Sequence, residues 1–133
     1  MIKENSEKYN NIMKQILLIV TLTILLIDVN AQTSCNEFMT SVKSKGYGTT
    51  YSSYNSDAIS KVTFYDITID YKYYYFAIVC FKQEYSSCKE YIYQVNSNTK
   101  FNYSLNYMDS AGKAFWKYIH PYNNNLECAP SFE

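Results

Sequence analysis

The sequence predicts an α+β fold, in which a small antiparallel β-meander of three to four strands is combined with an N-terminal helix and two short C-terminal helices packed on one face of the sheet. Three observations lead to this prediction. Residues 35–45 have the apolar spacing of a helix, residues 59–95 alternate between apolar and polar side chains, and residues 101–119 return to helical spacing.

The first 31 of the 133 residues have the features of a secretory signal peptide. Lysines precede an apolar run at residues 16–27, and Val29-Asn30-Ala31 provides the small residues that a signal peptidase recognises. The run is shorter than the about 20 apolar residues that a membrane-spanning helix requires. We therefore expect cleavage after Ala31 and export of residues 32–133, either to the periplasm or as a secreted protein.

A membrane anchor and a lipoprotein are the alternatives to a cleaved leader. The short apolar run disfavours the anchor. The residues before Cys35 lack the Leu and the small residues of a lipobox, which disfavours the lipoprotein. The segment before Met13 is long for a leader, so Met13 is a second candidate for the start of the chain.

All four cysteines lie beyond the expected leader, and an even number in a small exported domain indicates disulfides. Cys80 and Cys88 flank a segment typical of a hairpin loop, so we expect them to pair across two antiparallel strands. Cys35 is then left to pair with Cys128, although four cysteines allow other connectivities. The spacings contain no Cys-x₂-Cys pair and the chain has a single His, so we expect no metal site and no cofactor.

The N-terminal helix of the exported part is expected at residues 35–45. Ser34-Cys35-Asn36-Glu37 has the form of a capping box, and Gly46 stands where the helix should stop. Residues 46–57 are mostly polar, and we expect a loop there with at most a short extended piece.

Strand patterns begin at Ile59. Apolar residues alternate with polar ones up to Asp66, and the same alternation recurs at residues 67–70. The dense apolar run from Tyr73 to Phe81 is typical of a central strand covered on both faces. Residues 83–87 are expected to turn the chain, and residues 89–95 to return as the next strand.

Two short helices are expected after the strands. Phe101, Leu105 and Met108 recur at helical spacing and are predicted to form the inner face of the first. Ser110 is expected to cap the second helix, and Pro121 to end it. Its predicted inner face consists of Ala111, Ala114, Phe115, Tyr118 and Ile119.

Several of these segments carry motifs that resemble the KTSC domain. The motifs are Tyr91-Ile92-Tyr93 on a strand, Ser110-Ala111-Gly112-Lys113-Ala114-Phe115 at a helix start, Tyr65-Asp66 at a strand end, and residues 119–122 at a helix end. The resemblance covers residues 60–122, with residues 32–59 as an N-terminal helix and loop extension and residues 123–133 as a C-terminal tail. It implies a β-meander followed by helices. The link between Asp66 and Tyr73 departs from the family, because it is longer than usual.

The KTSC family has no established activity, although RNA binding has been suggested for it. This chain has no Arg and a formal net charge of zero, which argues against binding a polyanion such as nucleic acid. We expect a tyrosine-rich, monomeric, non-enzymatic interaction module for a protein or peptide. A carbohydrate-binding module is the alternative, and a genome rich in A and T would also explain the 16 tyrosines.

The candidate ligand-binding residues are aromatic. Tyr91 and Tyr93 project from one face of a strand, where they either pack against the second helix or form an aromatic platform. Trp116 lies on the flank of that helix and is the best candidate for an exposed contact. Three tyrosines of the first loop are expected to join it: Tyr47, Tyr51 and Tyr54.

No catalytic constellation is evident, and we expect no enzyme. His120 is the single His and has no nucleophile at a defined spacing. Acidic residues on strand ends and loops are more often solvated than paired for glycoside hydrolysis. Those considered are Asp66, Asp70, Glu84 and Glu90.

Overall fold

The computed structural model describes the backbone of residues 2–132 and the side chains of residues 5–20 and 34–132. The chain divides into two units, Met1–Ser34 and Cys35–Glu133. The first unit is helical. The expected cleavage site at residues 29–31 lies outside the residues whose side chains are described. Among the residues that are described, no helix is both long enough and apolar enough to cross a bilayer.

Helix α1 (Ile2–Lys45) corrects one expectation. It ends at Lys45 as predicted, but it does not begin at the capping box, since the backbone is already helical before Ser34. No Gly or Pro occurs before Gly46, so nothing in the local sequence interrupts the helix. The helix also ends without a left-handed glycine, because no glycine in the described chain has a positive φ angle.

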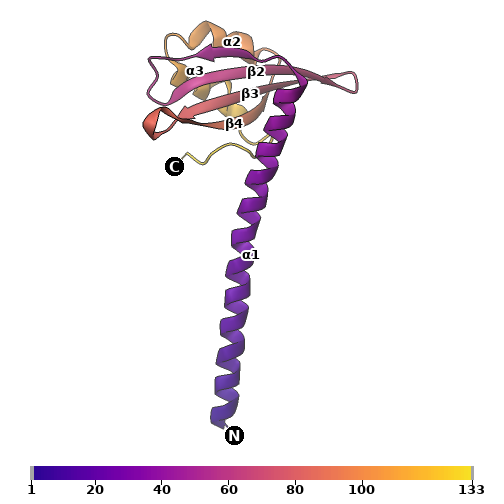
Figure 1. Cartoon of the computed structure of the whole chain (residues 1–133), viewed down its shortest axis with the longest axis vertical. Coiled ribbons are helices and arrows are strands. Elements are labelled where there is room, and N and C mark those ends of the chain that lie inside the picture. Colours follow the sequence, from indigo (N-terminus) through magenta and orange to yellow (C-terminus); the bar gives the residue numbers. More distant parts are fainter. Residues whose placement is uncertain (1, 133) are drawn as a thin grey trace. The chain divides into compact units, whose positions relative to one another are not determined.

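The second unit contains one antiparallel sheet of four strands in the order β1-β2-β3-β4 (Figure 1). The strands are β1 (Thr49–Ser52), β2 (Ile59–Ile69), β3 (Lys72–Lys82) and β4 (Cys88–Val95). The predicted meander is thus confirmed. The loop predicted at residues 46–57 contains β1, which pairs with β2 from Thr49 opposite Phe64 to Ser52 opposite Lys61.

Strands β2 and β3 are joined by a tight hairpin rather than by a long link. Ile69 pairs with Lys72, so only Asp70 and Tyr71 form the turn. Both have positive φ angles, 49° and 64°, as a type I′ turn requires. This turn was not predicted, because type I′ turns usually have Gly at the second central position, where this one has Tyr71.

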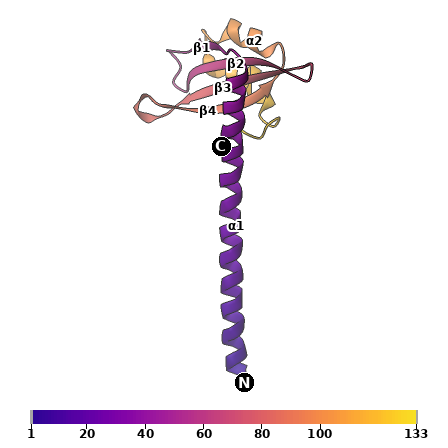
Figure 2. The same ribbon diagram turned by 45° about the vertical axis from the view of Figure 1, so that its right-hand side comes forward.

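Helices α2 (Thr99–Asn106) and α3 (Ala111–Tyr118) cover one face of the sheet, as predicted. In both views α2 lies over the β1 side of the sheet (Figure 1, Figure 2). The Ser110 side chain caps α3 by accepting a hydrogen bond from the Lys113 amide. A 3₁₀ turn, η2 (His120–Tyr122), follows α3 and contains Pro121.

The main core lies between this face and the two helices. Its buried members are Ile59, Val62, Phe64, Ala77, Val79, Tyr93, Val95, Tyr103, Ala111, Ala114, Phe115 and Ile119. The opposite face is covered by the last turns of α1 through Val42, which packs with Ile67, Phe76, Ile78 and Ile92. Strand β3 is therefore buried on both faces, as its apolar run predicts.

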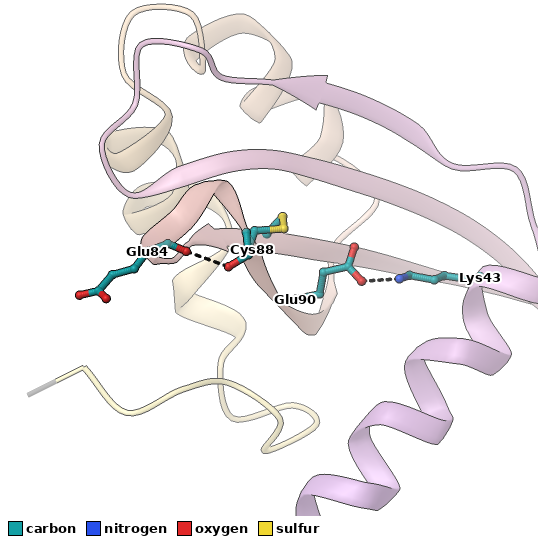
Figure 3. Close-up of a disulfide and its surroundings, with 6 residues drawn as sticks. Lys43, Glu84, Cys88 and Glu90 are labelled. Atoms are coloured by element: carbon teal, nitrogen blue, oxygen red, sulfur yellow. Dashed lines mark hydrogen bonds and ion pairs between the residues drawn. A yellow bond between two sulfur atoms is a disulfide. The ribbon is translucent and has the colours of Figure 1, made fainter.

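Both expected disulfides are present. Cys80 on β3 is bonded to Cys88 at the start of β4, with Cα atoms 5.4 Å apart. Near this bridge, Lys43 of α1 forms an ion pair with Glu90 of β4 (Figure 3). Cys35 is bonded to Cys128, with Cα atoms 5.7 Å apart and a separation of 93 positions in sequence. The tail is thereby fixed to the helix that covers the second face.

Candidate functional site

The outer side of α2 is the largest departure from the sequence-based expectation. Phe101, Leu105 and Met108, which were predicted to face the core, are 64%, 63% and 81% exposed. Their spacing places them along one side of α2 and its C-terminal turn. We refer to these three residues as the α2 stripe.

A competing apolar face of the same helix is buried instead. Tyr103 is fully buried, and its ring lies 5.6 Å from that of Phe64 and 6.2 Å from that of Tyr51. Tyr107 stacks on Tyr103 with ring centroids 5.7 Å apart. Because these large rings fill the space over β1 and β2, the α2 stripe has no place in the core. Tyr51 belongs to this packing and not to an exposed platform.

A hollow of about 510 Å³ adjoins the end of the α2 stripe. Its walls are the β1–β2 loop, with Tyr54 and Asp57, and the α2–α3 connection, with Met108 and Asp109. Tyr54 is 90% exposed, so this part of the predicted aromatic loop is available to a ligand. The apolar stripe therefore leads into a polar depression.

Three buried hydroxyl groups lie beneath this surface or in the core beside it. Those of Ser53, Tyr93 and Tyr103 have no hydrogen-bond partner among the described residues. Burial raises the pKa of Tyr103 to about 12. The nearby Ser53 hydroxyl lowers this pKa, although the two hydroxyls do not have the geometry of a normal hydrogen bond, and Tyr107 raises it. Burial also raises the pKa of Tyr93 far above its ordinary value, with a smaller contribution from Tyr91. Both phenols are therefore neutral at any physiological pH.

The aromatic platform proposed for β4 is not formed by Tyr93. This side chain is 1% exposed and packs against Phe115, so it belongs to the core. Its inward direction follows from the alternation of side chains along β4, which places Tyr91, Tyr93 and Val95 on the helix-covered face. Tyr91 is half-buried, and its ring contacts that of Phe81 at 5.8 Å. Neither residue offers a free ring face comparable to that of Trp116.

Trp116 is half-exposed, as expected, and lies in an aromatic group that the sequence did not predict. The His120 ring lies 4.2 Å from the Trp116 ring, and the ring of Phe132 from the C-terminal tail lies 5.1 Å from it. These rings border a hollow of about 530 Å³, which is also lined by Asn123, Asn124, Glu127, Ala129, Pro130 and Ser131. We refer to it as the Trp116 hollow. The helical spacing of Trp116 and His120 could have predicted that their rings lie together. The position of Phe132 could not be predicted in this way, because it depends on the tail disulfide.

The residues considered for catalysis are dispersed. Asp66 forms an ion pair with Lys100 at 2.6 Å, and Glu90 pairs with Lys43. The His120 ring packs against the rings of Phe115, Trp116 and Phe132. Within the described part of the chain, no three Asp, Glu, His or Cys side chains are grouped as a metal site would require.

No protein-family model matches the chain, and neither the curated proteins nor the solved structures include a match to it. The resemblance to the KTSC domain therefore stays a hypothesis that rests on the motifs of residues 60–122 and their order along the chain.

Proposed function

We propose that the chain is an exported, disulfide-bonded interaction domain that binds a protein or peptide through the α2 stripe. The observation that carries the proposal is the exposure of Phe101, Leu105 and Met108 on one side of a short helix. Single exposed apolar side chains are common, but a patch of a few hundred Å² on a monomer is often an interaction site.

The shape of this surface favours a peptide-sized partner. The three side chains are too few to form an interface of about 800 Å² per partner, which a stable protein dimer requires. A short apolar segment needs less area, and the hollow beside Met108 extends the surface with polar groups. Asp57 and Asp109 on its walls form no ion pair among the described residues, which favours a segment that also carries a positive charge.

Two observations support export. Disulfides persist in oxidising compartments, and both predicted bridges are formed. The leader at residues 1–31 has the charge and apolar pattern of a signal peptide. RNA binding is not part of the proposal, because the chain has no Arg and no net charge.

The test is a peptide and glycan array probed with the oxidised protein and with a Phe101→Ser/Leu105→Ser/Met108→Ser variant. All three side chains are exposed, so the variant is expected to fold, and its free energy of unfolding should change by about 0.5 kcal/mol or less per site. The proposal predicts that peptides with both apolar and basic residues bind the wild-type protein but not the variant.

A matched control is the Tyr47→Ser/Tyr85→Ser variant, which removes aromatic surface elsewhere on the domain, since these residues are 102% and 96% exposed. It should bind the same peptides as the wild type. Equal peptide binding by the stripe variant and the wild type would contradict the proposal, and so would an array on which no peptide retains the wild type.

A further inference from the structure

The Trp116 hollow combines aromatic rings with hydrogen-bonding side chains. It shares no lining residue with the hollow beside the α2 stripe. Trp116 and Phe132 are 51% and 44% exposed, so each ring keeps apolar surface in contact with solvent. His120 lies against Trp116 with its ring tilted by 47°. Together the three rings provide the aromatic part of the lining of the hollow.

The rest of the lining includes hydrogen-bonding side chains that the fold itself does not use, and we refer to these as the polar wall. The side chains of Asn123, Asn124 and Glu127 form no hydrogen bond or ion pair among the described residues. The neighbouring Asn125 provides a contrast, since its amide donates to the Gln94 carbonyl at 2.9 Å and so fixes the tail to β4. Three of these four polar residues are therefore free to bind a ligand.

The polar wall is held in place by an unusual backbone. Glu127 has a φ angle of 53°, in the left-handed region that residues other than Gly, Asn and Asp seldom adopt. Its neighbours on both sides are anchored, Leu126 by packing on the second core and Cys128 by the disulfide to Cys35. A strained conformation that is kept by its surroundings is a feature of ligand-binding sites.

We propose that the Trp116 hollow binds a neutral carbohydrate ring. A sugar ring has an apolar face of C–H groups, which matches the indole, and a rim of hydroxyls, which match amide and carboxylate groups. The site would pack the sugar on Trp116 and hydrogen-bond its hydroxyls to Asn123, Asn124 and Glu127.

Other ligand chemistries fit the hollow less well. A cation would gain a single carboxylate, and it would leave the amide N–H groups of Asn123 and Asn124 without acceptors. An anionic sugar would be repelled by Glu127. A peptide would leave the three polar side chains partly unpaired, at a cost that a hydroxyl-rich ligand avoids.

The single tryptophan of the chain makes the test direct, because its emission reports on this hollow alone. The oxidised full chain is titrated with neutral mono- and oligosaccharides of hexoses and N-acetylhexosamines, up to about 10 mM, a range that covers weak binding. At least one of these sugars is expected to shift the Trp116 emission with saturation. Choline and glucuronate, as cationic and anionic probes, should not shift it.

Variants separate this site from the α2 stripe. Asn124→Ala and Glu127→Ala should weaken sugar binding about tenfold each, which corresponds to the loss of one hydrogen bond to the ligand. Trp116→Ala should abolish retention on an immobilised form of the same sugar. The Phe101→Ser/Leu105→Ser/Met108→Ser variant should bind the sugar as the wild type does, so the two proposals fail independently.

Three results would overturn the inference. In the first, no neutral sugar shifts the emission at the highest concentration. In the second, choline or glucuronate binds instead. In the third, the Trp116→Ala variant is retained on the sugar as well as the wild type.

Discussion

The rings of Tyr93 and Phe115 pack edge to face with centroids 5.7 Å apart and so join β4 to α3 at the centre of the main core. Both side chains are 1% exposed. The sequence predicted this contact from the two periodicities alone, since Tyr93 lies on the inner face of a strand and Phe115 on the inner face of a helix. Around this pair the rings of Phe81, Trp116 and Phe132 also contact Phe115.

Replacing Phe115 by Ala is therefore expected to lower the free energy of unfolding by about 3–5 kcal/mol. Urea unfolding of the oxidised protein measures the change. Phe101→Ala on α2 is the matched control, since it removes a ring that is largely exposed and should cost about 1 kcal/mol or less. A loss below about 1 kcal/mol for Phe115→Ala would mean that this ring is not part of the core.

The two disulfides are expected to differ in their contribution to stability. On the chain-entropy model the Cys35–Cys128 bridge, which closes most of the domain, contributes about 4–5 kcal/mol, and the short Cys80–Cys88 loop about 2–3 kcal/mol. Unfolding of Cys35→Ala/Cys128→Ala and Cys80→Ala/Cys88→Ala variants compares them. Mass spectrometry should first find no free thiol and a Cys80–Cys88 peptide; two or more free thiols, or a Cys35–Cys80 peptide, would refute the pairing.

The turn between β2 and β3 offers a stabilising substitution. Tyr71 adopts a φ angle of 64° with a fully exposed side chain, and a left-handed backbone costs a non-glycine residue about 1–2 kcal/mol. Tyr71→Gly is therefore expected to raise the melting temperature, by an amount that corresponds to about 1 kcal/mol. Tyr73→Gly, two residues later on β3, should lower it. If both substitutions lower it, the turn is not of the type described.

Tyr103 makes stability sensitive to alkaline pH. Burial raises its pKa in the folded state to about 12, whereas in the unfolded chain the pKa is near the ordinary tyrosine value of 10.0. Between these two values the unfolded state loses the proton first, so the free energy of unfolding falls as the pH rises from about 10 towards about 12. Below pH 10 this contribution is fully present.

Tyr103→Phe removes this titration, together with a buried hydroxyl that has no hydrogen-bond partner. The variant should be at least as stable as the wild type at pH 7, because the Tyr103 hydroxyl forms no hydrogen bond that the substitution could break. The nearby Ser53 hydroxyl has no partner in the wild type either. Its stability should also fall less steeply above pH 10. Tyr47→Phe, at a fully exposed position, should change neither quantity. A marked loss of stability for Tyr103→Phe at pH 7 would show that its hydroxyl is hydrogen-bonded.

The parts of the fold that the sequence predicted are those with one dominant apolar pattern. The strands β2, β3 and β4 and helix α3 each have a single apolar face, or an apolar run, that leaves no choice of orientation. The pairing of the four cysteines followed from the hairpin around residues 83–87. In these elements the local pattern and the final packing agree.

The orientation of α2 was predicted wrongly because its sequence contains two apolar faces. Phe101, Leu105 and Met108 form one, and Thr99, Tyr103 and Tyr107 form the other, both at helical spacing. A helix of eight residues has too few positions for periodicity to choose between them. The choice is made by Tyr51 and Phe64, whose rings contact Tyr103 and come from strands that are distant in sequence.

The two candidate sites were also predicted from the sequence only in part. Trp116 was identified from its place on the flank of α3. The polar wall of its hollow was not, because residues 123–132 follow a course that depends on the Cys35–Cys128 bridge rather than on any repeating pattern. The α2 stripe is visible in the sequence only as a set of apolar residues, and the structure alone shows that they are exposed.

Calorimetric titration with the best peptide from the array measures whether the α2 stripe binds that peptide. Binding is expected with a negative heat-capacity change, the mark of apolar surface burial. Replacing Phe101, Leu105 and Met108 by Ser should reduce the affinity tenfold or more, about 1.4 kcal/mol. Trp116→Ala should leave the affinity unchanged. Full affinity in the stripe variant, or loss of affinity only in Trp116→Ala, would contradict the assignment of peptide binding to α2.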